Sequence, residues 1–210
     1  MAIIPPSSPL YKMRGSVGNI TVYERDGVVI ARSLPSPNKR RKASPLQKLH
    51  LNSFQAQHAL AKSIKRILID RVWAKEKLTG GMTPYSYFIK CNRAAFGRTD
   101  HIAFPELMEI SHGQLLPAPG FSAYRDSDML NFKWDSSMTG WLAAPSDRLN
   151  IMMLINRKDL LTLDISACRS DGVASISLSN IPETAEGFVF WSSSNDETFS
   201  PSIYWTCSQA

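Results

Sequence analysis

The feature that most constrains the fold is a run of short strand-like segments in the second half of the chain. From Phe104 onward, apolar and β-branched segments alternate with clusters of Gly, Pro, Asn, Asp and Ser, and no helical pattern lies between them. Strands at this spacing are typical of an antiparallel β-sandwich, in which each sheet buries one face against the other. The predicted strands are Leu107–Ile110, Met129–Trp134, Leu149–Ile155, Leu163–Cys168, Ala174–Leu178, Gly187–Ser192 and Ser202–Cys207.

Trp134 lies where immunoglobulin-like sandwiches place a core aromatic residue. No pair of cysteines flanks it, which favours a fibronectin-like sandwich over an antibody-like one. Successive side chains of a strand point to opposite faces, so the core residues should alternate with outward-facing ones. The predicted sandwich core contains Trp134, Ile151, Met153, Ile176 and Phe190.

A β-hairpin is predicted near the N-terminus. The β-branched runs Val17–Tyr23 and Val28–Ala31 are joined by a turn that ends in Asp26-Gly27, a pair that readily adopts positive φ. Gly15 and Gly18 bracket the entry to the first run, where glycine permits a bulge or the close approach of another backbone. Because an isolated hairpin is marginal in water, we expect it to pack on its own helix, join the main sheet or pair with another chain. In this interpretation the segment through residue 32 buries no core of its own.

The positive charge of the chain is concentrated in one region. The whole chain has a net charge of +6 and a pI near 9.3, yet residues 39–77 alone hold eleven basic and only two acidic residues. The segment from 33 to 43 is predicted to be a linker, and it contains a basic arm formed by Lys39, Arg40, Arg41 and Lys42. There are three hypotheses for the role of this arm: it is a solvated linker, it contacts the phosphates of a nucleic acid, or it docks on an acidic protein. The arm has no interleaved aromatic residues on which nucleic-acid bases could stack, which argues against recognition of bases.

Two helices are predicted between the arm and the strands. Ser44, Pro45 and Gln47 form a capping-box start, and the apolar stripe Leu60, Ile64, Ile67, Leu68 and Val72 extends that helix to about Trp73. The second helix starts with Thr83 and Pro84 and ends before Gly97. Its predicted apolar face is Tyr87, Phe88, Cys91, Ala94 and Ala95.

No arrangement in the sequence predicts catalysis, a metal or a cofactor. The four histidines have none of the spacings that bind zinc, and there is neither a nucleophile elbow nor a Gly-rich phosphate loop. The three cysteines are odd in number and far apart, which favours a reducing compartment. The sequence shows no signal-peptide pattern and no apolar run long enough to span a bilayer, so we expect no membrane partner. The missing export signal also disfavours a surface adhesin.

The chain resembles a family of unknown function, about 210 residues long, from Bacteroidota and their mobile elements. The matching residues are Gly15-x-x-Gly18, Arg32-Ser33-x-Pro35, Pro45-x-Gln47, Phe88-Ile89-Lys90-x-Asn92, Ser111-x-Gly113-x-Leu115, Trp134, Ser146-x-x-Leu149, Arg169-x-x-Gly172 and Ser200-x-Ser202-x-Tyr204. The resemblance implies a fibronectin type III-like C-terminal half and no assigned activity. The hairpin, arm and helix start also resemble, more weakly, the N-termini of tailed-phage virion proteins.

Together these patterns predict an α+β protein in three segments: an arm with hairpin and basic linker (1–43), a helical segment (44–103) and an antiparallel β-sandwich (104–210). We expect a non-enzymatic structural or assembly protein, a phage virion component or a mobile-element equivalent. It would reside in the virion, and in the bacterial cytoplasm before assembly. The predicted contact residues are Gly15, Gly18, Lys39, Arg40, Arg41 and Lys42, and the predicted partners are other structural subunits. The alternative is a cytoplasmic accessory protein that binds nucleic acid.

Overall fold

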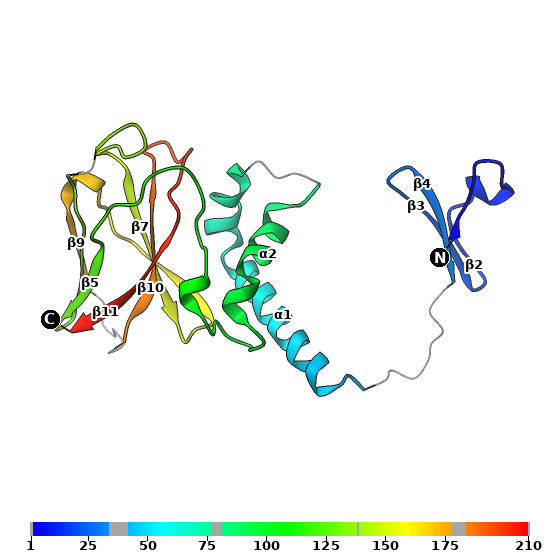
Figure 1. Cartoon of the computed structure of the whole chain (residues 1–210), viewed down its shortest axis with the longest axis horizontal. Helices are drawn as coiled ribbons and strands as arrows, with labels where there is room; N and C mark the ends of the chain where they lie inside the picture. Colours follow the sequence, from blue (N-terminus) through cyan, green and yellow to red (C-terminus); the bar gives the residue numbers. More distant parts are fainter. Residues whose placement is uncertain (1, 34–41, 77–80, 138, 178–183, 210) are drawn as a thin grey trace. The chain divides into compact units, whose positions relative to one another are not determined.

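The computed structural model describes residues 2–33, 42–76, 81–137, 139–177 and 184–209 (Figure 1). The chain divides into two compact units, Met1–Ala43 and Ser44–Ala210. The first unit is a small antiparallel sheet, and the second packs helices against a large curled sheet. The fold is therefore mixed α+β with a β-sandwich-like C-terminal half, as the sequence predicts.

The N-terminal unit is a four-stranded sheet rather than a single hairpin. Its strands β1 (Ala2–Ile3), β2 (Gly15–Val17), β3 (Ile20–Arg25) and β4 (Val28–Ser33) are antiparallel in the order β1-β4-β3-β2. The turn between β3 and β4 has φ of +53° at Asp26 and +76° at Gly27. Both values fit the primed turns that match the twist of a hairpin, so the Asp-Gly turn is confirmed.

This sheet has a small core of its own. Ile4, Val22 and Val29 are buried, and Tyr11 and Ala31 pack against them. Tyr11 belongs to the 3-10 turn Pro9–Lys12, where the Ser8 hydroxyl accepts a hydrogen bond from the backbone N–H of Leu10. The prediction that this segment buries no core is therefore wrong, because the N-terminal residues fold back over one face of the sheet.

The helix starts are those predicted. α1 (Pro45–Ser63) begins with a capping box in which the Ser44 hydroxyl accepts from the Gln47 N–H at 3.2 Å and the Gln47 side chain accepts from the Ser44 N–H at 2.9 Å. α2 (Pro84–Phe96) is capped by Thr83 and ends at Gly97, which has a φ of +55°.

The apolar stripes of the two helices differ from the prediction in three details. The α-helical winding of α1 ends at Ser63, and the chain continues as a π-helical turn (Lys65–Ile69) and a 3-10 turn (Trp73–Lys75). The wider π-helical winding changes the angle between successive side chains, which leaves Ile67 51% exposed. On α2, Asn92 and Phe96 are buried in place of Ala94.

The C-terminal half is one curled seven-stranded sheet. Its strands lie in the order β8-β7-β10-β11-β5-β6-β9. The β11–β5 pair is parallel and the others are antiparallel, so the sheet is mixed. The bounds are β5 (Ser122–Asp126), β6 (Met129–Lys133), β7 (Arg148–Ile155), β8 (Asp159–Leu163), β9 (Val173–Ser177), β10 (Glu186–Ser192) and β11 (Ile203–Gln209).

Three strand predictions need correction. The segment predicted as Leu107–Ile110 contains the end of a 3-10 turn, Pro105–Leu107, and no strand. The strand predicted at Leu163–Cys168 lies earlier, at Asp159–Leu163. Strand β5 was missed because its sequence, SAYRD, has only Ala123 fully buried; pairing with β6 and β11 holds it in the sheet.

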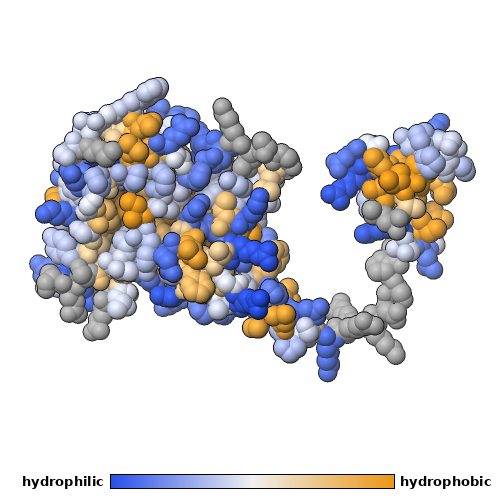
Figure 2. Space-filling model, viewed as in Figure 1, coloured by the Kyte–Doolittle hydropathy of each residue, from blue (hydrophilic) through white to orange (hydrophobic). Residues whose placement is uncertain are grey.

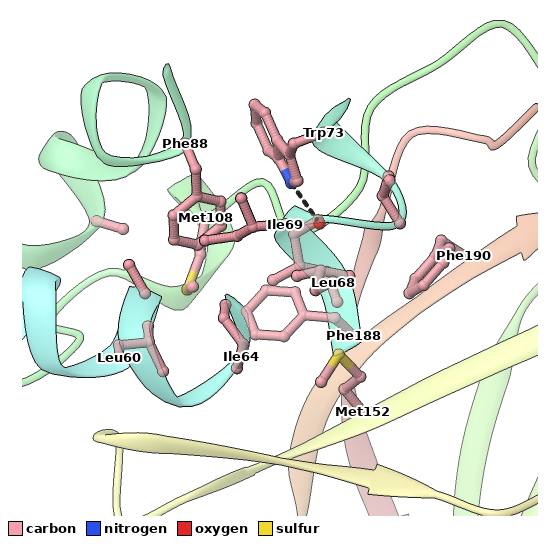
Figure 3. Packing of buried hydrophobic residues seen from close by; sticks show 14 of the residues in the cluster. Leu60, Ile64, Leu68, Ile69, Trp73, Phe88, Met108, Met152, Phe188 and Phe190 are labelled. Atoms are coloured by element: carbon pink, nitrogen blue, oxygen red, sulfur yellow. Dashed lines mark hydrogen bonds between the residues drawn. The ribbon is translucent and has the colours of Figure 1, made fainter. Parts of the chain in front are cut away.

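Strands β7 and β10 are buried on both faces, which gives the second unit two cores. Leu149, Ile151 and Met153 face the sandwich interior with Trp134 and Trp205. The alternate residues Met152 and Leu154 face the helices, with Phe188 and Phe190 of β10 beside them (Figure 3). Phe190 was predicted for the sandwich core and instead lies in the core that the helices cover, because it is out of phase with Val189 and Trp191. Trp134, Ile151 and Met153 are confirmed, and Ile176 is half-buried against the same cluster.

Polar contacts also join the helical residues to the sandwich. The Trp73 indole N–H donates to the Ile110 carbonyl at 2.9 Å (Figure 3). Buried Asn92 donates to the carbonyls of Phe88 and Glu109 and accepts from the Glu109 N–H at 2.7 Å. Residues 44–103 and 104–210 therefore share the core that lies between the helices and the sheet, and they form a single unit.

Candidate interaction surfaces

Three of the residues that carry the sequence resemblance, Ser111, Gly113 and Ser200, have structural roles. The Ser111 hydroxyl donates to the Ser200 carbonyl at 2.7 Å, and the Ser200 hydroxyl accepts from the Trp191 N–H at 2.9 Å. A Cβ at Gly113 would lie 2.2 Å from the Phe199 carbonyl oxygen, so only glycine fits there. These three residues therefore hold the segment 111–113 against the residues that lead from β10 into β11.

The most polar buried cluster surrounds Arg169. Its guanidinium is fully buried, pairs with the Asp147 carboxylate at 3.2 Å, donates to the Leu116 carbonyl at 2.6 Å and lies over the Trp191 ring at 4.8 Å. The Trp134 indole N–H donates to the Arg169 carbonyl at 2.8 Å. Asp147, Arg169 and Trp191 do not line the groove between α1 and α2 or the cavity beside His112. It is a structural network that joins Asp147 at the start of β7 to the 3-10 turn Arg169–Asp171.

The ionisable groups with shifted pKa values do not converge on one place. Burial raises the pKa of the Cys91 and Cys207 thiols, which keeps them protonated at neutral pH. Burial and a hydrogen bond to Glu186 raise the pKa of the Tyr204 hydroxyl. Within the described ranges, no group of three His, Cys, Asp or Glu residues could hold a metal ion. The three cysteines form no disulfide.

Gly15 and Gly18 lie at an open edge of the N-terminal sheet. Gly15 is in β2, the edge strand, with a φ of +109°, and Gly18 is in the two-residue turn to β3 with a φ of +57°. A Cβ at either position would meet no atom within 4 Å. The glycines are thus required by the backbone conformation, and the space beside them is open.

The N-terminal sheet also has an apolar row on the face opposite its core. Ile3, Ile30 and Tyr23 are register partners across β1, β4 and β3, so their side chains lie side by side. Ile3 is 70% exposed, Ile30 is buried at 8%, and Tyr23 is half-buried with the Arg32 guanidinium over its ring at 5.6 Å. Figure 2 shows hydrophobic residues gathered on this unit. An open sheet edge is where another chain can add a strand, because its backbone N–H and C=O groups have no partner within the sheet.

The basic arm is only partly described. Lys42 is exposed and precedes the Ser44 cap of α1, whereas Lys39, Arg40 and Arg41 lie outside the described residues. Their predicted contact role therefore stays a prediction.

A groove between α1 and α2 is a surface that the sequence prediction missed. Its volume is about 910 Å³, and its lining includes the apolar side chains of Leu51, Phe54 and Ile89 together with Lys90 and Arg93. Leu46, Leu49 and Phe54 of α1 are 50%, 47% and 54% exposed. Spacing along α1 could have revealed this surface, because the apolar stripe of the helix starts before the residues that were assigned to it.

Two further observations concern the second unit and the whole chain. Trp141 is 96% exposed in a turn closed by the Gly140 and Ala143 backbones, with Leu142 beside it. Among the described residues, no helix is both long and apolar enough to cross a membrane.

The chain matches no protein-family model, no curated protein and no solved structure. Its fold and surfaces define a mixed α+β protein with a β-sandwich-like half, a separate small sheet and several exposed apolar patches.

Proposed function

We propose that this protein is a non-enzymatic structural or assembly protein that docks on other subunits through residues 1–43. The observation that carries the proposal is the N-terminal sheet, which forms its own unit with two edge strands and with Ile3, 70% exposed, at the end of the apolar row opposite its core. A partner strand at β2 would complete the backbone hydrogen bonds of that edge, beside the open space at Gly15 and Gly18.

The place of assembly that fits this role best is a phage virion, or an equivalent particle encoded by a mobile element. The support is the weak resemblance of the hairpin, arm and helix start to virion proteins, and the resemblance of the whole chain to a mobile-element family with a fibronectin-like half. In a virion the second unit would supply a further contact surface, for which the fully exposed Trp141 is a candidate.

The mass of the native assembly tests the proposal. Full-length protein should run well above its monomer mass of 23.4 kDa in light scattering, either alone or in the particle fraction of its source. A chain that starts at Ser44 should fold and run as a monomer, because its cores lie entirely within residues 44–210.

A matched pair of substitutions locates the contact. Ile3→Glu places a charge in the apolar row and should abolish assembly, whereas Leu161→Glu places a charge at a 48% exposed site on β8 and should leave assembly intact. Full-length protein that is monomeric both alone and in extracts of its source would refute the proposal.

A second candidate is a nucleic-acid-binding accessory protein, favoured by the excess of basic residues between 39 and 77. If the basic arm (Lys39, Arg40, Arg41 and Lys42) contacts phosphates, binding should be independent of the nucleotide sequence and should weaken steeply as the salt concentration rises. Replacing these four residues with Gln should flatten that salt dependence. Undetectable binding of duplex DNA or RNA at low salt would exclude this candidate.

A further inference from the structure

The core-facing stripe of α1 extends beyond the helix that covers it. Leu46, Leu49, Ser53, Gln57, Leu60 and Ile64 recur at intervals of three and four residues, which places them on one face. The last four are at most 6% exposed, whereas Leu46 and Leu49 are 50% and 47% exposed. In Figure 1 the first turns of α1 project past the rest of the second unit, and Figure 2 shows hydrophobic residues at that surface.

The uncovered leucines lie beside the α1–α2 groove, because Gln47 and His50 from the same turns of α1 line it. Phe54 is 54% exposed and its ring packs on His58 at 4.2 Å, so one of its faces remains available to a ligand. Leu51 and Ile89 add apolar surface to the groove. Leucines at helical spacing followed by an aromatic wall are what an amphipathic helix binds when it lies in a groove.

The charged residues that line the α1–α2 groove are basic. Neither α1 nor α2 contains Asp or Glu, and among the described residues no acidic side chain lines the groove, whereas Lys90 and Arg93 line it and are exposed. The next acidic residue along the chain, Asp100, is paired with Lys158 at 2.8 Å. A ligand that covers the apolar stripe therefore gains by carrying negative charge.

We propose that the α1–α2 groove binds an acidic amphipathic helix from another protein. Its apolar side chains would cover Leu46, Leu49 and Phe54, and its carboxylates would meet Lys90 and Arg93. A second copy of α1 fits less well, because antiparallel pairing would bring two acid-free basic helices together. Nucleic acid fits less well because phosphates gain nothing from exposed leucines. The proposal concerns residues 46–97 and does not depend on assembly through residues 1–43.

Fluorescence anisotropy of a labelled peptide on the full chain tests the proposal. The probe is a helical peptide with Leu at positions i, i+3, i+4 and i+7 and Glu on its other faces, and the control peptide has Lys in place of every Glu. We expect the Glu peptide to bind at least about tenfold more tightly than the Lys peptide. Charge reversal of the groove by Lys90→Glu with Arg93→Glu should invert that preference.

The apolar contribution has its own matched control. Leu46→Gln with Leu49→Gln should weaken the Glu peptide about tenfold. Leu142→Gln with Leu161→Gln, which changes two exposed leucines of the sandwich, should leave its affinity unchanged. All four leucines are at least 39% exposed, so melting temperatures should confirm that each variant is folded.

Four results would overturn the proposal. The first two are no binding of the Glu peptide and equal binding of the Glu and Lys peptides. The third is self-association that the Leu46 and Leu49 substitutions abolish, which would assign the surface to a second copy. The fourth is displacement of the peptide by duplex DNA, with a salt dependence that the Lys90 and Arg93 substitutions flatten, which would assign the surface to nucleic acid.

Discussion

Removal of the Asp147 carboxylate should destabilise the second unit more than removal of any exposed carboxylate. The Asp147 side chain is 1% exposed and its carboxylate lies 3.2 Å from the fully buried guanidinium of Arg169. It also accepts the backbone N–H of Ala144 at 2.9 Å. Asp147→Ala therefore leaves a buried positive charge without its counter-ion, a change that costs about 3–5 kcal/mol.

Urea denaturation followed by tryptophan fluorescence measures this cost. For a unit of this size, about 3–5 kcal/mol corresponds to a fall of roughly 6–20 °C in melting temperature. The control is Glu197→Ala, which removes an ion pair with Lys75 whose side chains are 61% and 42% exposed and should cost about 0–1 kcal/mol. A loss for Asp147→Ala as small as that of the control would refute the reasoning, because it would mean that water solvates Arg169.

Three other predictions concern the core and two titrating groups. Trp134→Ala empties a site that is 3% exposed and should cost about 3–5 kcal/mol; an unchanged denaturation midpoint would mean that Trp134 is not core. Hydrogen bonds from Lys158 and His101 lower the pKa of Asp100 to about 2. The stabilisation from Asp100 should be present above its unfolded-state pKa and lost as the pH falls through about 2, and NMR titration should show Lys158→Ala raising this pKa. Burial raises the pKa of Cys91, so its alkylation at neutral pH, followed by mass spectrometry, should be slower in the folded protein than in urea; equal rates would contradict this.

Local signals in the sequence were reliable where one short segment contains all the required chemistry. The Ser44 capping box, the Thr83 start of α2 and the Asp26-Gly27 turn all lie where the residues predict them. Each depends on hydrogen bonds or φ values within four residues, so no distant partner changes the outcome.

Elements that depend on distant partners were predicted less well. Strand β5 has little apolar character and exists because β6 and β11 pair with it. β1, only two residues long, exists because it pairs with β4. Successive side chains of β10 point to opposite faces of the sheet, but this alternation did not indicate that helices would cover the second face. Phe190 was therefore assigned to the wrong core.

The candidate surfaces divide in the same way. The sequence by itself determined the positive charge of residues 39–77, the glycines of the N-terminal turn and the start of α1, because composition and short-range backbone preferences fix these features. Only the tertiary structure decided that the apolar stripe of α1 is covered from Ser53 onward and uncovered at Leu46 and Leu49. The spacing of apolar residues within one helix defines a stripe, but the exposure of that stripe to solvent depends on where the neighbouring helix ends.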